Sequence, residues 1–361
     1  MEDPGDHSDA TILMLLSHSN QSYEDVSNST TNNQAIRPES VVFLILQSIV
    51  CILACLGNVI VIIVILKYLR WRSTTNKFVI NLAVADFFTG ISSGFQVFFF
   101  VFPATQSDFV ACLLGYQILT LMTLTSQLTV TFTTLDRYLA VCHPHKHPRI
   151  ITHNAANLLI VISWVYSFVF FFLPFTGFNN WKRGVPCFYQ LIVKPLQLFL
   201  MALTMLLFTV GTLIMYIFIV LTARRYMSQV RPSQRHHLTN VFDISRNAKI
   251  SSNLKLLKDY RGIKVVAAVT LMFSICWLPY TYFQIRVFSD PVDYIHSWEW
   301  NIANWIVFVG IAKSIMNPLI YAWQRRDFNM AVRKLFRRLI HVIVHHRQRD
   351  PPASTVKETR F

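Results

Sequence analysis

The amino-acid sequence predicts an all-α membrane protein, a seven-transmembrane helix bundle followed by a short amphipathic helix. Two observations predict this class. Hydrophobic residues make up 53% of the 361 residues and charged residues only 14%, whereas soluble domains carry about 25% charged residues. The apolar residues also fall in seven long blocks, each near the length of about 20 residues that crosses a bilayer.

The seven blocks divide the chain into a tail, a bundle and a C-terminal region. We expect an extracellular tail over 1–40, the bundle over 41–323, an amphipathic membrane-surface helix over 324–343 and a cytoplasmic tail over 344–361. The individual spans are predicted at 41–66, 78–102, 110–135, 155–175, 196–222, 264–288 and 301–323. Seven spans place the two termini on opposite sides of the membrane.

The charged residues predict which side each terminus occupies. Most of the 33 Lys and Arg lie in the segments after spans one, three, five and seven, whereas acidic residues crowd the N-terminal tail. Because cytoplasmic loops carry the excess of Lys and Arg, we expect a plasma-membrane protein with its N-terminus outside and its C-terminus in the cytoplasm. The net charge of +15 then reflects loops beside an anionic leaflet and does not indicate a nucleic-acid partner.

The outer segments carry two kinds of processing signal. The N-terminal tail has no apolar core, so span one is expected to act as an uncleaved signal-anchor. Asn20 and Asn28 each begin an Asn-X-Ser/Thr triplet, which predicts glycosylation. Of the six cysteines, only Cys112 and Cys187 face the oxidising outer space, and this predicts a single disulfide between span three and the loop before span five.

Two motifs place polar and charged groups inside or at the edge of apolar spans, where lipid makes them energetically unfavourable. Asp136-Arg137-Tyr138 ends span three, and Asn317-Pro318-Leu319-Ile320-Tyr321 lies in span seven. Charged residues and broken helices are costly in lipid and are retained where something is bound or switched. This pattern favours a receptor that changes shape over an enzyme.

With these motifs, the chain over about residues 40–340 resembles a rhodopsin-like (class A) G-protein-coupled receptor. The marks of the family stand in the right order: Asn58, Leu82-Ala83-Val84-Ala85-Asp86, Cys112, Asp136-Arg137-Tyr138, Trp164, Tyr216, Phe273-Ser274-Ile275-Cys276-Trp277-Leu278-Pro279 and Asn317-Pro318-Leu319-Ile320-Tyr321. The resemblance implies that the chain binds an extracellular ligand and activates heterotrimeric G proteins by outward movement of helix six, with arrestin as a further partner. It implies no enzymatic activity, no cofactor and no metal.

The resemblance also assigns a role to the motif residues. Arg137 pairs with Asp136 or, across the bundle, with Asp259, and this pairing keeps the receptor inactive. Release of Arg137 would let it bind the G protein, with Tyr216 and Tyr321 moving in as hydroxyl partners. Trp277 is expected to form the floor of the ligand cavity, and Pro279 leaves a kink about which helix six can pivot.

Lys313 is the most unusual residue of span seven. Asp86, with Asn58, Ser126, Ser314 and Asn317, resembles the sodium site of the family, in which the position of Lys313 commonly holds a small polar residue. Lys313 and Asn317 are four residues apart and share a helix face. We therefore expect the ammonium of Lys313 to pair with Asp86 and replace the sodium ion. The alternative is a lysine that hydrogen-bonds carbonyls or water in a wet cavity, or that simply disables the site.

Several ligand classes are disfavoured. Opsins hold retinal on a lysine six residues before the Asn of span seven, where this chain has Ile311, and amine receptors use an Asp where this chain has Leu119. An apolar, aromatic cavity is predicted from Gln96, Tyr116, Leu119, Thr120, Phe188, Tyr280, Gln284, Val307 and Ile311. Such a cavity suits a peptide, a nucleoside or a lipid-like molecule, and the alternative is a ligand-independent seven-helix signalling or scaffold protein.

Subfamily features point in two directions. The segment Pro174-Phe175-Thr176-Gly177-Phe178-Asn179-Asn180 resembles adenosine-type receptors. Phe208, where most members have proline, resembles the melanocortin and lipid-receptor group. The subfamily stays open at this point.

The cytoplasmic segments are predicted to be basic and in part mobile. The third inner loop, about 223–263, is long and polar, which favours mobility. The apolar residues after span seven recur at helical spacing among arginines and lysines, which predicts a helix lying on membrane lipid; they are Phe328, Val332, Leu335, Phe336 and Leu339. Thr359-Arg360-Phe361 fits a ligand of a PDZ-type domain.

The sequence lacks the patterns of two other classes of membrane protein. A transporter would need repeated charged residues through the core or inverted repeats, and a membrane hydrolase would need an Asp pair or a His/Glu cluster at membrane depth. The sequence provides neither pattern, because Asp86 stands alone inside the predicted spans.

Overall fold

The computed structural model describes the backbone of residues 38–71, 73–102, 105, 107–182, 187, 189–236, 245–289 and 297–349. Inside its helices, the side chains of 38–40, 191, 226–263, 297–301, 339 and 342–349 lie outside the description. The predicted glycosylation sites at Asn20 and Asn28, the ligand candidate Phe188 and the C-terminal motif Thr359-Arg360-Phe361 also lie outside the described residues.

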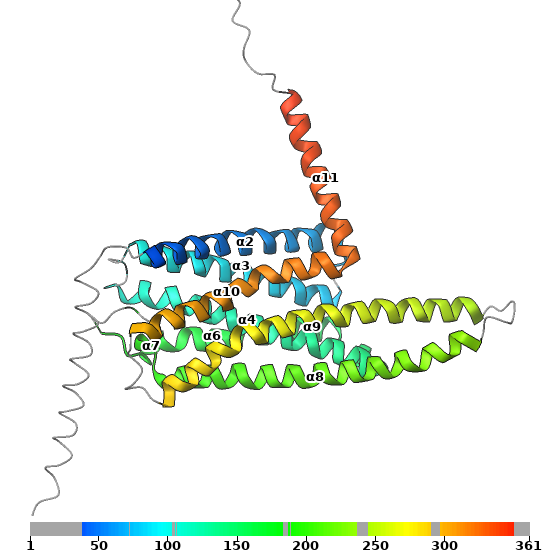
Figure 1. Ribbon diagram of the computed structural model, residues 1–361, viewed down its shortest axis with the longest axis horizontal. Helices are drawn as coiled ribbons and strands as arrows, with labels where there is room; N and C mark the ends of the chain where they lie inside the picture. The colour runs from blue at the N-terminus through cyan, green and yellow to red at the C-terminus, as the bar shows by residue number, and fades with distance from the viewer. Residues whose placement is uncertain are drawn as a thin grey trace, which may run out of the picture.

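Seven helices of the described chain are long and apolar enough to cross a membrane, as predicted. They are α2 (Pro38–Tyr68), α3 (Thr74–Val101), α4 (Phe109–Cys142), α6 (His153–Phe172), α8 (Pro195–His236), α9 (Ser245–Ser289) and α10 (Ser297–Gln324). They run side by side as one bundle (Figure 1). Three short helices, α5 (His147–Ile150), η2 (Leu173–Thr176) and α7 (Tyr189–Ile192), lie in the connections, and α11 (Arg326–Arg349) follows the bundle.

Helix α4 is the central helix of the bundle. It packs against α3, α6, α8 and α9, and its middle is almost fully buried. Its start is fixed by Asp108, whose carboxylate accepts a hydrogen bond from the backbone N–H of Ala111 at 2.8 Å, a good N-terminal cap. In contrast, α2, α6 and α8 expose large apolar side chains such as Leu56, Val165 and Leu207, as expected for a surface that meets lipid.

The ends of several helices differ from the prediction. Helix α4 continues to Cys142, past the predicted end at 135, so Asp136 and Arg137 lie inside the helix and not at its last turn. Much of the segment 223–263, predicted as a long polar loop, is helical, because α8 continues to His236 and α9 begins at Ser245. Both helices extend beyond the rest of the bundle (Figure 1). Polar residues can prolong a helix in water once a buried stretch has nucleated it.

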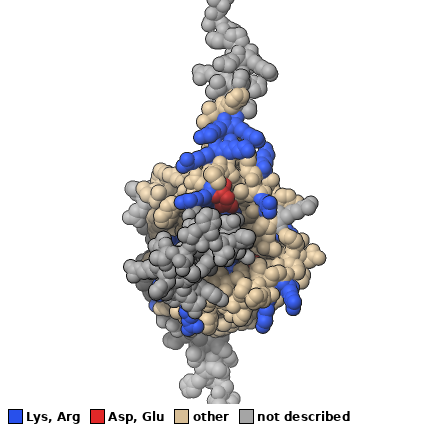
Figure 2. Space-filling model, turned by 90° about the vertical axis from the view of Figure 1, so that its right-hand side faces the viewer, with Lys and Arg blue, Asp and Glu red and all other residues tan. Residues whose placement is uncertain are grey.

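The helix after the bundle is longer than predicted and leaves the bundle at a steep angle (Figure 1). Helix α11 spans 24 residues, from Arg326 to Arg349. Lys and Arg side chains gather where it leaves the bundle (Figure 2). The ammonium of Lys334 and the guanidinium of Arg338 lie 5.8 and 5.5 Å from the centre of the Tyr68 ring of α2. These cation–π contacts hold the first turns of α11 against the bundle.

The predicted disulfide between Cys112 and Cys187 is confirmed, with a Cα–Cα distance of 5.9 Å. It joins the first turn of α4 to the segment before α7, and the phenol of Tyr116 donates a hydrogen bond to the carbonyl of Cys187 at 3.0 Å. We call this the disulfide end of the bundle and the opposite end, at Arg137, the Arg137 end. A bridge between Asn179 and Val193 further holds the connection over the disulfide end.

Replacing either cysteine of the disulfide by serine should lower the amount of folded protein, because a closed loop of this length restrains the unfolded chain by about 4–5 kcal/mol. The double variant should be no worse than either single variant, because one bond is lost in all three. Surface delivery of tagged protein measures this. An additive loss in the double variant would contradict the pairing.

Candidate functional site

A cavity of about 160 Å³ opens at the disulfide end of the bundle. It is bounded by α2, α3, α4, α8, α9, α10 and the segment held by the disulfide. Its lining is aromatic and aliphatic with amide and hydroxyl groups between: Phe43, Leu44, Gln47, Gln96, Phe99, Phe100, Tyr116, Leu119, Thr120, Thr123, Cys187, Tyr189, Gln190, Met201, Trp277, Tyr280, Asn304 and Val307.

The structure brings together six of the nine predicted cavity residues. Gln96, Tyr116, Leu119, Thr120, Tyr280 and Val307 line the cavity. Two others do not: Gln284 is fully buried with its amide nitrogen 3.9 Å from the sulfur of Met201, and Ile311 packs with Val50 and Leu119. Helical facing alone predicted both as lining residues, whereas contacts with neighbouring helices bury them beside the cavity.

Trp277 lies on the cavity wall as expected, and a glycine fixes its position. A Cβ atom on Gly310 of α10 would lie 2.9 Å from the Trp277 ring, closer than real Cβ contacts. Gly115 of α4 similarly makes room for the ring of Phe99, since a Cβ there would lie 1.8 Å from a ring carbon. Glycine therefore allows two of the cavity's aromatic rings to lie close against neighbouring helices.

The hydroxyl groups of the cavity wall are bonded to one another. The hydroxyls of Thr120 and Tyr189 lie 3.0 Å apart. Tyr189 stands outside the membrane-spanning helices, and burial raises its pKa to about 12 despite that hydrogen bond. Its phenol is therefore neutral at physiological pH, like the rest of the described lining.

Beyond Trp277, the middle of the bundle holds a buried ion pair. The ammonium of Lys313 lies 2.9 Å from Oδ1 of Asp86, and the two side chains are 2% and 0% exposed. Ser126 and Ser314 donate to the same oxygen at 3.2 and 3.1 Å, and Asn317 donates to Oδ2 at 2.5 Å. The predicted pairing of Lys313 with Asp86 is thus present.

The ion pair joins four helices. Asp86 belongs to α3, Ser126 to α4, and Lys313 to α10. The ring of Phe273, from α9, lies with its centre 4.8 Å from the ammonium of Lys313, a cation–π contact. Asn58 of α2 does not reach Asp86; its amide donates instead to the carbonyl of Ser314 at 3.1 Å.

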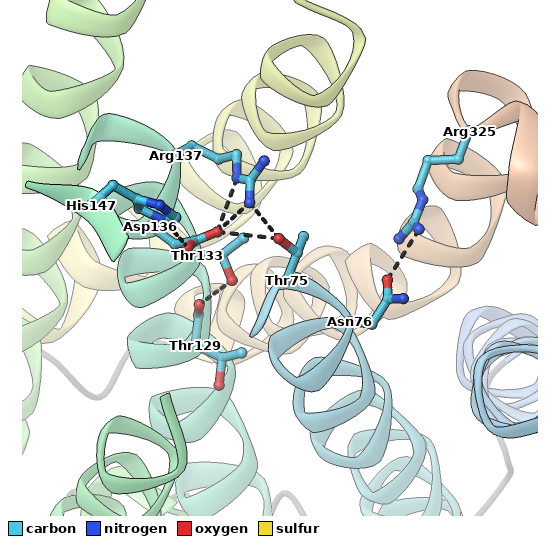
Figure 3. A network of polar contacts seen from close by, with 8 residues as sticks. All are labelled: Thr75, Asn76, Thr129, Thr133, Asp136, Arg137, His147 and Arg325. Atoms are coloured by element: carbon cyan, nitrogen blue, oxygen red, sulfur yellow. Dashed lines mark hydrogen bonds and ion pairs between the residues drawn. The ribbon is translucent and has the colours of Figure 1, made fainter. Parts of the chain in front are cut away.

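A second, larger cavity of about 920 Å³ lies at the Arg137 end. Arg137 and Tyr321 line it, together with residues of α3 and α9. The Arg137 side chain does not extend into this space freely, because it pairs with Asp136 at 2.5 Å and donates to the hydroxyl of Thr75 on α3 (Figure 3).

Asp136 is fully buried and holds three partners at once (Figure 3). One oxygen accepts from Arg137 and, at 3.2 Å, from Thr75. The other lies 2.9 Å from Nε2 of His147 in α5. The carboxylate therefore connects α4 to α3 and to α5. It also restrains Arg137, its own neighbour in the sequence.

A separate polar contact lies where α10 meets α11. Arg325 donates to the side-chain oxygen of Asn76 at 3.0 Å (Figure 3). It also pairs with Asp327 at 2.8 Å. Partial burial would raise the pKa of Asp327, but the hydrogen bond and charge of Arg325 outweigh it and lower the pKa below its ordinary value. Asp327 is therefore ionised at neutral pH and complements the first turn of α11.

The remaining motif residues occupy the same end. Tyr321 is buried, with its ring centre 6.1 Å from that of Phe328. Tyr138 packs edge-on against Phe218 at 6.4 Å, and Tyr216 is partly buried on α8. The side chain of Asp259 lies outside the described residues, so its pairing with Arg137 stays a prediction.

The ion pair should be far less tolerant of losing Asp86 than of losing Lys313. Asp86→Asn strands a buried ammonium whose other described neighbour is the Phe273 ring, at a cost of about 3–5 kcal/mol. Lys313→Met leaves the carboxylate with its three side-chain donors. We expect Asp86→Asn to lower the thermal stability of the purified protein more than Lys313→Met, and the double variant to recover part of the loss. Equal stability of Asp86→Asn and wild type would contradict this.

Comparison with known proteins agrees with this arrangement. The chain matches the family described as 7 transmembrane receptor (rhodopsin family) over residues 57–321. It is 28% identical over 348 residues to the adenosine receptor A2a of Homo sapiens, covering 86% of this chain and 75% of that receptor. It is 24% identical over 327 residues to the adenosine receptor A2b of Gallus gallus, covering 82% and 89%, and 26% identical over 345 residues to the thyrotropin-releasing hormone receptor of Bos taurus, covering 86% and 84%. The chain belongs to the rhodopsin family of seven-transmembrane receptors and is a multi-pass G-protein-coupled receptor of the plasma membrane.

Proposed function

We propose that this receptor binds an extracellular ligand in the cavity at the disulfide end and activates heterotrimeric G proteins through the cavity at the Arg137 end. The observation that carries the proposal is the position of Arg137 at the edge of the larger cavity, where Asp136 and Thr75 hold its side chain. The disulfide end faces outward and the Arg137 end inward, because most Lys and Arg flank the latter.

The contacts between the two cavities suggest how the signal travels. The ring centres of Trp277 and Phe273 are 6.4 Å apart on α9, and Phe273 touches the ammonium of Lys313. A ligand that moves Trp277 must therefore disturb the contact between α9 and the ion pair. Pro279, inside α9, removes one backbone hydrogen bond and provides the pivot for outward movement.

The cavity lining supports an uncharged ligand over a biogenic amine. Leu119 occupies the position at which amine receptors use an acid, and it lines the cavity. Adenosine and thyrotropin-releasing hormone appear in the names of the relatives, and a nucleoside or a peptide fits such a lining better than a charged amine. A ligand-independent receptor is the alternative outcome of the test below.

The function can be tested without knowing the ligand. Asp136→Asn removes the charge that restrains Arg137, so ligand-free activation of G proteins should rise several-fold, and Asp136→Asn with Arg137→Ala should lose it. Asp108→Asn is a suitable control, since it keeps the helix cap at the other end of the bundle. The measurement is energy transfer between G-protein subunits at matched surface expression, with each G-protein class tested in turn. No activation of any class by wild type or Asp136→Asn would contradict the proposal.

Signalling should also be indifferent to sodium. Lys313 already neutralises Asp86, and a second cation would meet its charge at close range where water screens poorly. Replacing sodium by N-methyl-D-glucamine at constant ionic strength should leave basal signalling unchanged, whereas Lys313→Asn should make it sodium-sensitive. Sodium sensitivity of the wild type that disappears in Asp86→Asn would show that the ion still binds.

A further inference from the structure

The cavity at the disulfide end has no charged side chain in its described lining. Among its eighteen lining residues there is no Asp, Glu, Lys, Arg or His. The nearby charges of Asp86 and Lys313 neutralise each other. A ligand group with a full charge would lose its water and find no counterion, so the lining discriminates against ions of both signs.

Two buried polar atoms of this lining have no partner in the protein. Gln47 of α2 is 2% exposed, and its amide nitrogen donates to the side-chain oxygen of Gln96 on α3 at 2.7 Å. The side-chain oxygen of Gln47 accepts nothing, and the hydroxyl of Thr123, 3% exposed, is equally unpaired. Buried polar groups are nearly always bonded. Unpaired atoms in two residues that line a cavity therefore favour a ligand that these side chains turn to meet.

The Gln47–Gln96 pair presents a donor and an acceptor next to each other. The described contacts use the nitrogen of Gln47 and the oxygen of Gln96. They leave the Gln47 oxygen as an acceptor and the Gln96 nitrogen as a donor. A planar group that carries both an N–H and a carbonyl oxygen, such as a carboxamide, a lactam or an imide, complements this pair.

We propose that the cavity recognises an uncharged ligand through a carboxamide-like group bound by Gln47 and Gln96, with an attached ring packed against the surrounding aromatic side chains. The inference rests on the proposed function, in that this cavity is the ligand site. Phe43, Phe99, Phe100 and Tyr116 supply the aromatic walls. A volume of about 160 Å³ accepts one ring with a small substituent, since an engineered cavity of about 150 Å³ holds benzene.

Four probes of nearly equal shape test this chemistry directly: benzamide, benzoate, benzylamine as its cation, and toluene. Each is added to the purified full-length receptor, and binding is measured by ligand-observed NMR and by the rise in unfolding temperature. Benzamide should bind at least tenfold more tightly than the other three. Equal binding of benzoate, benzylamine or toluene would overturn the inference, and so would an absence of benzamide binding.

A matched pair of glutamine variants shows whether Gln47 is responsible. Gln47→Leu should weaken benzamide about tenfold, whereas Gln117→Leu should not. Gln117 is also fully buried with neither amide atom partnered, but it does not line the cavity. Gln47→Glu should transfer the preference from benzamide to benzylamine, a gain that misfolding cannot produce. Unchanged selectivity in Gln47→Glu would overturn the assignment.

The result separates this inference from the proposed function. If the Asp136→Asn variant activates G proteins but the receptor does not bind benzamide, the proposed function stands and the proposed ligand chemistry is wrong. If benzamide binds with the expected dependence on Gln47 but no G protein is activated, the ligand chemistry stands and the proposed signalling function is wrong.

Discussion

Burying a lysine and an aspartate together in the middle of a membrane-spanning bundle removes both charges from water, and the geometry around Lys313 and Asp86 is what makes this tolerable. The carboxylate accepts from Lys313, two serines and an asparagine, so its lone pairs are well used. A buried pair of this kind seldom adds net stability, but it strongly disfavours any arrangement in which one partner is left alone. Helices α3, α4 and α10 are therefore fixed relative to each other at mid-depth, and movement is left to the helices around them.

Of the four helices that meet at the ion pair, α9 is the one without a hydrogen bond to Asp86 among the described contacts. Its contact with the ion pair is the face of Phe273 against the ammonium of Lys313, which can be broken without stranding a charge, because Asp86 remains. Trp277 lies one turn further along α9, and Gly310 allows its ring to lie close against α10. The bundle thus combines a rigid polar centre with a neighbouring helix attached through aromatic surfaces, and Pro279 loosens that helix at the same level.

The sequence was sufficient for the fold and for the ion pair, but not for the detail of either cavity. The seven apolar spans and the disulfide follow from hydrophobic block length and compartment. The facing of Lys313 toward Asp86 follows from the resemblance to the family's sodium site, together with the cost of a lone buried charge. The ends of α4, α8 and α9 were predicted too short, because the prediction followed the apolar span that crosses the lipid. These helices continue past that span into segments that contain polar residues. The contacts of His147 and Thr75 with Asp136 were not predicted, because they depend on how α5 and α3 pack beside α4, which the sequence does not show. Gln47 was missed for a similar reason, since a single glutamine in an apolar span does not reveal which neighbour it meets.

The arm formed by α11 has a mechanical consequence for the whole bundle. A helix of 24 residues is about 36 Å long at 1.5 Å per residue, and this one leaves the bundle at a steep angle (Figure 1). An amphipathic helix must lie in the plane of the membrane surface to bury its apolar side. Because Lys334 and Arg338 hold its base against Tyr68, we expect α11, lying on the membrane surface, to oppose tilting of the seven helices. Its length would then help to set the orientation of the receptor in its bilayer from one edge of the bundle.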